Sequence, residues 1–476
     1  MAYHKPASFK SPQAFQEYLT ASGIQLPFET DIEPAPHSPL AQPFSLHGWT
    51  IGNRFAVLPM EGWDGTSDGR PSELTFRRWQ RFGLSGAKLV WGGEAVAIHP
   101  DCRANPNQLI INRETLPDLA QLRQALEDSH AAGFGETHDL VVGLQLTHSG
   151  RYSCPFDKAR PTPHLAYDHP WLNPRLGLPS LSGRVLSDEE LDEIVERFIV
   201  AAQLAQEAGF QFVDIKHCHG YLGHELLSAI YRGGKYGGSL ENRTGFLRQI
   251  IAGIQTHAPG MAIGVRLSAF DFIPFRKGLN EIGEPEFMTM GQVYPYAFGG
   301  DGSGLGIDLS EPVALIKMLD QMGVRLVCIT AGSPYYNPHI QRPAYFPPSD
   351  GYQAPENPLA GVARLVWAAE AIKAQCPQAV VVGSAYSCLQ EWLPNVAQAV
   401  VRRGSADFAG LGRMMLSYPQ MPADILAGRN LRRKLICRTF SNCTTAPRKG
   451  LVSGCFPLDS FYKARPEAHL LQNNKP

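Results

Sequence analysis

The sequence predicts an α/β protein in which short buried strands alternate with amphipathic helices. Ser187-Asp-Glu-Glu190 is a capping box that opens a helix with apolar residues along one face, and Gly209 ends that helix. An apolar run at 210–215, too short for a helix and rich in β-branched and aromatic residues, reads as a buried strand. A second helix is expected at 240–255. Helix, glycine stop and buried strand together form one α/β unit.

Polar side chains that donate hydrogen bonds or carry protons follow this strand at once. They are Lys216, His217, His219 and Tyr221. In a barrel of parallel strands, catalytic groups project from the carboxyl ends of the strands, so position and residue type agree. Each of these residues alone is more often structural, and their shared position is what predicts an active-site edge here.

Length, charge and composition exclude several classes of function. The chain has 476 residues, 44% of them hydrophobic, and a formal net charge of -1, which suits a large globular core and argues against nucleic acid as a partner. No apolar run approaches the roughly 20 residues that span a bilayer, and the N-terminus lacks the apolar stretch of a secretory signal. We therefore expect a cytoplasmic protein, with nine cysteines present as thiols or metal ligands.

Three segments together resemble the signature of the old yellow enzyme family of FMN-dependent oxidoreductases. They are Ala208–Ile215, His219-Gly-Tyr-Leu222 and Tyr236–Phe246, and further matches follow in chain order from about Pro43 to Leu426. The resemblance implies one TIM (β/α)8 barrel over 43–430, with an N-terminal extension at 1–42 and a short cysteine-containing extension at 431–476. The chain is most similar to the branch of trimethylamine dehydrogenase and 2,4-dienoyl-CoA reductase, without the nucleotide-binding domains of that branch.

The other elements are predicted from apolar runs and turn residues. The N-terminal extension is Pro-rich and is expected to pack over the barrel or a neighbouring subunit, as a homo-oligomer would allow. A hairpin is expected at 44–54, and strands at 55–60, 87–96, from 140 to about 148, and at 262–268, 324–330, 379–384 and 407–413. The long connection 269–306 is predicted to cover the substrate. Aromatic residues at 333–351 stack on a substrate or form a packed loop core.

The resemblance also implies which residues bind FMN. They are Pro59, Met60, Gly92, Gly93, Gln145, Arg266, Gly332, Gly383, Ser384, Gly412 and Arg413. Gln145 would bond the pyrimidine edge of the flavin and Arg266 its electron-rich edge, although a salt bridge within the barrel is the alternative for Arg266. The loops after strands seven and eight would bind the phosphate. Glu61 departs from the Thr or Cys of the family, and either alters the flavin, faces solvent or pairs with an arginine.

For catalysis, the resemblance implies hydride transfer from NADH or NADPH to FMN and then to the β-carbon of an activated alkene. Lys216 and His219 would meet the developing oxyanion, and Tyr221 would donate a proton to the α-carbon. Lysine replaces the histidine of the family, so His217 is an alternative donor. Two rival functions stay open: oxidative demethylation of a small amine, which Lys216 would disfavour by charge repulsion, and a scaffold that has lost FMN.

Cys437, Cys443 and Cys455 follow the barrel, where larger relatives hold a four-iron cluster. Phe440 occupies the position of the second cysteine ligand. A four-iron cluster normally takes four thiolates, so we expect no complete iron–sulfur cluster, with a three-iron cluster or a zinc site as the alternative.

Overall fold

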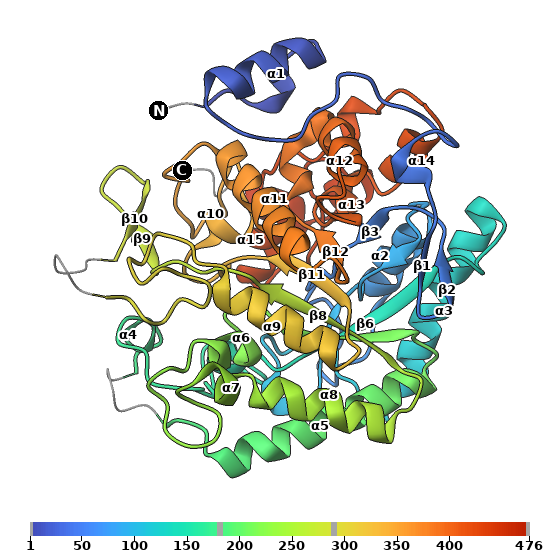
Figure 1. The fold of residues 1–476 in the computed structure, drawn as a ribbon. Helices are drawn as coiled ribbons and strands as arrows, with labels where there is room; N and C mark the ends of the chain where they lie inside the picture. Colours follow the sequence, from blue (N-terminus) through green and yellow to red (C-terminus); the bar gives the residue numbers. More distant parts are fainter. Residues whose placement is uncertain (1–2, 179–183, 287–292, 473–476) are drawn as a thin grey trace.

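The computed structural model describes residues 3–178, 184–286 and 293–472, and its centre is a closed barrel of eight parallel strands (Figure 1). The predicted TIM barrel is thereby confirmed. β5 (Ala95–Ala97) extends the sheet alongside β6, and β4 also pairs with β6, which closes the ring. The barrel strands are β3 (Phe55–Val57), β4 (Leu89–Val90), β6 (Val141–Thr147), β7 (Phe212–His217), β8 (Ala262–Ser268), β11 (Leu326–Thr330), β12 (Val380–Gly383) and β13 (Phe408–Leu411).

Helices surround this barrel. The long ones are α1 (Pro12–Ala21), α2 (Glu73–Gly83), α3 (Leu116–Phe134), α5 (Asp188–Glu207), α8 (Gly245–His257), α9 (Ser310–Gln321), α11 (Pro358–Gln375) and α12 (Leu393–Arg402). The short ones are α4 (Leu172–Arg175), α6 (Leu222–Leu227), α7 (Leu240–Arg243), α10 (Pro338–Gln341), α13 (Met414–Ser417), α14 (Met421–Leu426), α15 (Asn442–Arg448), α16 (Ser460–Lys463) and α17 (Glu467–Gln472). No helix among the described residues is long and apolar enough to cross a membrane.

The predicted capping box is present at the start of α5. The Ser187 hydroxyl accepts from the backbone N–H of Glu190 at 3.2 Å, and the Glu190 carboxylate accepts from that of Ser187 at 2.8 Å. The single helix predicted at 240–255 is wrong, because α7 ends and α8 begins around Thr244. The Thr244 hydroxyl donates to the carbonyl of Leu240 at 2.9 Å, a side-chain bond that competes with regular helix bonding.

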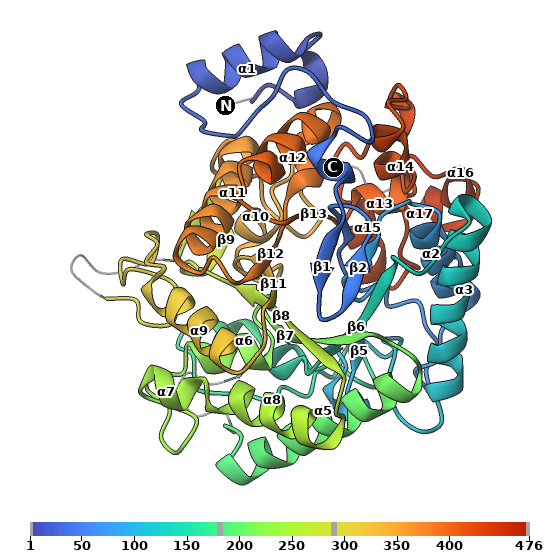
Figure 2. The ribbon, with the colours of Figure 1, turned by 45° about the vertical axis from the view of Figure 1, so that its right-hand side comes forward.

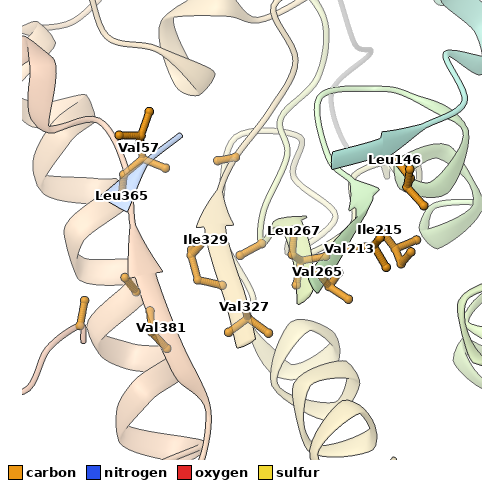
Figure 3. Packing of buried hydrophobic residues seen from close by; sticks show 14 of the residues in the cluster. Val57, Leu146, Val213, Ile215, Val265, Leu267, Val327, Ile329, Leu365 and Val381 are labelled. Atoms are coloured by element: carbon orange, nitrogen blue, oxygen red, sulfur yellow. The ribbon is translucent and has the colours of Figure 1, made fainter. Parts of the chain in front are cut away.

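Residues of each barrel strand alternate between two apolar layers. In β7, Val213 and Ile215 belong to the layer between strands and helices, part of which Figure 3 shows, whereas Phe212 belongs to the cluster inside the barrel. The same alternation turns Asp214 and Lys216 inward. The register of a single strand therefore decides which polar groups reach the barrel interior.

The hairpin of β1 (Phe44–Leu46) and β2 (Trp49–Ile51) forms as predicted. Its Leu46 and Ile51 pack with the cluster inside the barrel, near Ala262 at the beginning of β8. The hairpin thus covers the amino end of the barrel and leaves polar chemistry to the carboxyl end.

Both extensions pack on the barrel (Figure 2). Phe15 of α1 stacks on Trp392 with ring centroids 5.4 Å apart, and the Trp392 indole donates to the carbonyl of Pro6 at 2.9 Å. At the other end of the chain, Asp459 accepts two bonds from Arg77 of α2, at 2.9 and 3.0 Å. The long connection after β8 contains a small hairpin of β9 (Phe275–Lys277) and β10 (Gly283–Pro285).

Candidate functional site

A cavity of about 220 Å³ opens at the carboxyl ends of the barrel strands. It brings together most of the residues predicted from the sequence. Among its lining residues are Pro59, Met60, Gln145, Lys216, His219, Tyr221, Arg266, Ser384, Gly412 and Arg413. No described residue of the connection 269–306 lines the cavity, and the predicted covering role of this connection stays a prediction.

The predicted glycines Gly92, Gly93, Gly332 and Gly383 are not among the lining residues. Gly92 has φ +143°, and a Cβ there would lie 2.7 Å from the backbone nitrogen of Gln145. A side chain at this position would therefore push on the strand that holds Gln145. The flavin contacts of these glycines stay predictions.

Strand β7 decides which polar group near 216 faces the cavity. The sequence placed Lys216 and His217 after the strand, which is wrong because β7 continues to His217. The alternation of the strand turns Lys216 into the barrel and His217 outward, where its ring lies 6.3 Å from that of Phe246 and its pKa is lowered to about 4 by burial. His217 is therefore no substitute for Lys216 in the cavity.

Glu61 binds two of the three predicted catalytic residues. Its Oε1 pairs with Lys216 Nζ, and its Oε2 accepts the Tyr221 hydroxyl at 2.7 Å. Lys216 Nζ also lies 3.9 Å from the centre of the Tyr221 ring, a cation–π contact. Of the alternatives predicted for Glu61, an ion pair is present, but its partner is a lysine and not the predicted arginine. Burial, and then Glu61 and Tyr335, raise the pKa of the Tyr221 phenol well above its usual value.

His219 is held in a left-handed conformation with φ +67°. Its backbone N–H donates to Ser268 Oγ at 3.1 Å, and its carbonyl accepts from Ser333 Oγ at 2.8 Å. These bonds secure a backbone geometry that is costly for residues other than glycine. Burial, and then the charges of Arg266 and Lys216, lower the pKa of His219 well below its usual value, so the imidazole is neutral.

The neighbours of the His219 ring orient it. Its Nε2 lies 3.4 Å from Thr330 Oγ1 and 3.3 Å from the side-chain nitrogen of Gln341. Gln341 Oε1 is buried and has no hydrogen-bond partner among the described residues. The Gln341 nitrogen donates to Nε2, so the single proton of the neutral His219 imidazole is assigned to Nδ1.

Gln145 and Arg266 meet through a buried carboxylate. Asp214 accepts from the Gln145 amide at 2.5 Å and from the backbone N–H of Arg266 at 2.6 Å, and burial raises its pKa to about 6. This fixes the amide of Gln145 with its carbonyl oxygen free. The Arg266 side chain makes no salt bridge among the described residues, and its Nε is buried without a partner. The alternative of an intrabarrel salt bridge is therefore wrong.

Ser384 and three arginines, Arg342, Arg413 and Arg448, also line the cavity. Ser384 Oγ and Arg413 Nη1 are buried and have no hydrogen-bond partner in the described parts of the chain. Arg342 lies nearby, and burial together with the charges of Arg448 and Arg413 lowers its pKa to about 9. An anionic ligand would relieve this accumulation of buried positive charge.

Several residues that line the cavity were not predicted from the sequence. They are Trp63, Thr330, Pro334, Gln341, Arg342, Thr444, Pro447, Arg448 and Ser453. Most belong to the loop after β11 or to the C-terminal extension. No motif marks them, and the cysteines of the extension were the one signal that this segment lies near the site.

Cys437, Cys443 and Cys455 line a second, small cavity together with Phe440. Phe440, at the position of the second cluster cysteine, lies 5.2 Å from the ring of Phe346. Within the described residues, no three His, Cys, Asp or Glu side chains are arranged to hold a metal ion.

Residues 39–294 match the NADH:flavin oxidoreductase / NADH oxidase family. The chain belongs to this family. The NADPH dehydrogenase of Halalkalibacterium halodurans is 28% identical over 388 residues, which cover 80% of this chain and 92% of the relative.

Solved structures of other proteins share the barrel. A 2-naphthoyl-CoA reductase in complex with 2-naphthoyl-CoA superposes with a TM-score of 0.65 at 18% identity, over 88% of this chain and 56% of that one. This chain thus spans little more than half of that reductase. An old yellow enzyme homologue from Zymomonas mobilis has a TM-score of 0.56 at 19% identity, over 82% of this chain and 93% of that one.

The cofactors of this oxidoreductase family are FMN and NAD(P)H. The cavity of this family member fits FMN by the chemistry of its walls. Gln145 presents an amide fixed by Asp214, and Arg266 presents a guanidinium that has no carboxylate partner among the described residues. Ser384 Oγ and Arg413 Nη1 present donors for a phosphate that have no partner in the described parts of the chain.

Proposed function

We propose that this flavin oxidoreductase reduces the activated C=C bond of an α,β-unsaturated carbonyl compound with hydride from NAD(P)H. One observation carries the proposal: Lys216, His219 and Tyr221, from one strand end, line the same cavity as seven of the predicted flavin-binding residues. Gln145 and Arg266 would hold the flavin ring, with Pro59 and Met60 beside it. Ser384, Gly412 and Arg413 would hold its phosphate.

Bound FMN would supply the redox chemistry, the transfer of hydride from the nicotinamide to an electron-poor carbon. The protein must then stabilise an oxyanion and supply a proton. The neutral imidazole of His219 donates one hydrogen bond to the substrate carbonyl, and Lys216 supplies the positive charge. These two groups stabilise the enolate-like oxygen more than the ground-state carbonyl, which is the condition for lowering the barrier.

Tyr221 supplies the proton. Its raised pKa keeps the phenol protonated at any working pH, so the group is always ready to donate. The same raised pKa makes the phenol a weak acid, and only a strongly basic carbon removes its proton. Proton transfer would therefore accompany or follow arrival of the hydride at the β-carbon.

The charges of the cavity disfavour the rival amine chemistry. Its described lining residues include five cations, Lys216, Arg266, Arg342, Arg413 and Arg448, against the single carboxylate of Glu61. A bound FMN phosphate would neutralise part of this charge, but a protonated amine would still enter a positive field.

The test separates the two halves of the reaction. The purified protein is examined for bound FMN, reduced anaerobically with NADPH or NADH, and then mixed with 2-cyclohexenone. We expect Tyr221→Phe to keep flavin reduction within about twofold and to slow reoxidation by the enone by about 10²–10⁴-fold. His257→Gln, on the surface at the end of α8, is the control and should leave both rates unchanged.

Two results would contradict the proposal. One is failure of the protein to bind FMN, which would favour the hypothesis of a scaffold protein that has lost its cofactor. The other is reduction of its flavin by a small amine, with no reoxidation by any member of an enone and enoate panel.

A further inference from the structure

Glu61 occupies the hydrogen-bonding groups that the reaction needs. Its side chain is 18% exposed and that of Lys216 only 3%, so the ion pair between them lies at the inner edge of the cavity. The other carboxylate oxygen accepts the Tyr221 hydroxyl at 2.7 Å. One carboxylate therefore engages both the charge donor and the proton donor.

Counting protons fixes the direction of the neighbouring bonds. A carboxylate only accepts, and a phenol has a single proton, so the proton of Tyr221 points to Glu61. The hydroxyl of Tyr335 lies 2.9 Å from that of Tyr221 and must be the donor in that contact. Tyr335 is itself held by a stacked ring, that of Tyr152, at 3.7 Å. The chain of donors therefore runs from Tyr335 through Tyr221 to Glu61.

A substrate oxygen that reaches Lys216 must compete with Glu61. An anionic oxygen there must displace the Glu61 carboxylate from the buried ammonium or lie beside a second negative charge, and each alternative costs free energy. A neutral carbonyl can approach His219 while the ion pair between Glu61 and Lys216 stays intact, so Glu61 costs its binding little.

We propose that Glu61 is a specificity-determining residue: an internal counter-charge that selects ligands with a neutral oxygen over ligands with an anionic one. The inference rests on the proposed function, because it assumes a planar substrate beside the flavin. It predicts that neutral unsaturated carbonyl compounds bind in preference to unsaturated carboxylates and to compounds that ionise to an enolate or phenolate.

Binding to the FMN-loaded protein tests this without turnover. The probe is 4-hydroxybenzaldehyde at a pH where its phenol is ionised, and the matched probe is 4-methoxybenzaldehyde, which lacks the oxyanion. Each is titrated against the flavin absorption spectrum of the wild type and of Glu61→Gln, Glu61→Asp and Glu61→Gln/Lys216→Met. Gln keeps the shape of the side chain and removes the competing charge.

We expect Glu61→Gln to bind the phenolate at least about tenfold more tightly, or 1.4 kcal/mol. The methyl ether should change by less than about twofold. Glu61→Asp retains the competitor and should stay within about threefold of wild type for both probes. Adding Lys216→Met should abolish the gain, because the charge that attracts the phenolate is gone. This double variant has no unpaired buried charge, so absence of the gain there is not a result of instability.

Three results would overturn the inference. Unchanged or weaker phenolate binding in Glu61→Gln shows that Glu61 does not compete. An equal gain for both probes shows a looser cavity and no selection for charge. A gain that survives Lys216→Met shows that another cation binds the phenolate. In each case FMN is bound, so the proposed function is untouched; failure to bind FMN would instead refute the proposed function itself.

Discussion

Arg78 holds the segment that carries Glu61, and its removal is the most demanding test of the architecture of the site. Its guanidinium, 4% exposed, donates to both oxygens of Asp64 at 2.6 and 2.8 Å and to Glu94 at 2.6 Å. The second oxygen of Glu94 accepts the backbone N–H of Gly62 at 2.6 Å. One arginine thus ties α2, the turn after β4 and residues 62–64 together.

Arg78→Met leaves two buried carboxylates without a counter-charge. Removing one partner of a buried ion pair costs about 3–5 kcal/mol, and we expect a loss in this range at pH 8. Arg77→Met is the matched control on the same helix. Its partner Asp459 keeps Arg81 at 3.5 Å, so the expected loss is about 1 kcal/mol or less.

The pH dependence follows from the direction of the pKa shift. Burial, and then Asp64, raise the pKa of Glu94 from 4.5 to about 7, while Arg78 opposes the shift. A carboxyl with a raised folded-state pKa retains a proton that the unfolded chain releases, so its contribution to stability falls as pH rises through about 4.5–7. Without Arg78 the pKa rises further. The free-energy deficit of Arg78→Met should therefore be smaller at pH 5 than at pH 8, by up to about 1.4 kcal/mol.

Urea unfolding followed by tryptophan fluorescence, at pH 5 and pH 8 with FMN in fixed excess, measures these differences. A loss within about 1 kcal/mol of wild type would refute the reasoning about the buried network. An equal loss of unfolding free energy at pH 5 and pH 8 would also refute it, because the loss would then not depend on carboxyl ionisation.

Three further predictions concern the cavity. Gly92→Ala places a Cβ 2.7 Å from the backbone nitrogen of Gln145, at a residue whose φ is +143°. We expect the affinity for FMN, measured by fluorescence titration, to fall at least about tenfold. Unchanged affinity would count against Gln145 as a flavin ligand. Arg413→Met should weaken FMN by about 10- to 100-fold and riboflavin hardly at all, since only FMN carries the phosphate. Tyr335→Phe removes the donor to Tyr221 and should slow reoxidation by an enone about three- to tenfold in stopped-flow while flavin reduction holds; an equal effect on both steps would point to misfolding.

Parts of the fold could be read directly from the sequence. The strand at 262–268 has the predicted bounds, because an apolar run rich in β-branched residues between turn residues leaves little choice. The strand predicted at 87–96 is instead two short strands, β4 and β5. Gly92 and Gly93 interrupt it with positive φ, and an apolar pattern does not register such a change of direction.

The site, too, could be predicted only in part from the sequence. Lys216, His219 and Tyr221 lie on one continuous segment, so a local signature was enough to bring them to one cavity. The partner of Glu61 was not predictable, since Lys216 is 155 positions away in the chain. The same holds for Gln341 and for the lining residues of the C-terminal extension, which carry no local pattern.

The sequence by itself determined the class of the fold, the strand that carries the catalytic candidates and the family to which the chain belongs. These properties depend on short-range information: hydrophobic period, caps, turn residues and a contiguous signature. Only the tertiary structure decided which way each polar side chain faces and what it meets. Barrel closure brings Glu61 against Lys216 and Tyr221 and turns His217 away from them. The chemistry of this site is therefore governed by contacts between distant segments, which depend on strand register and packing and leave no trace in local pattern.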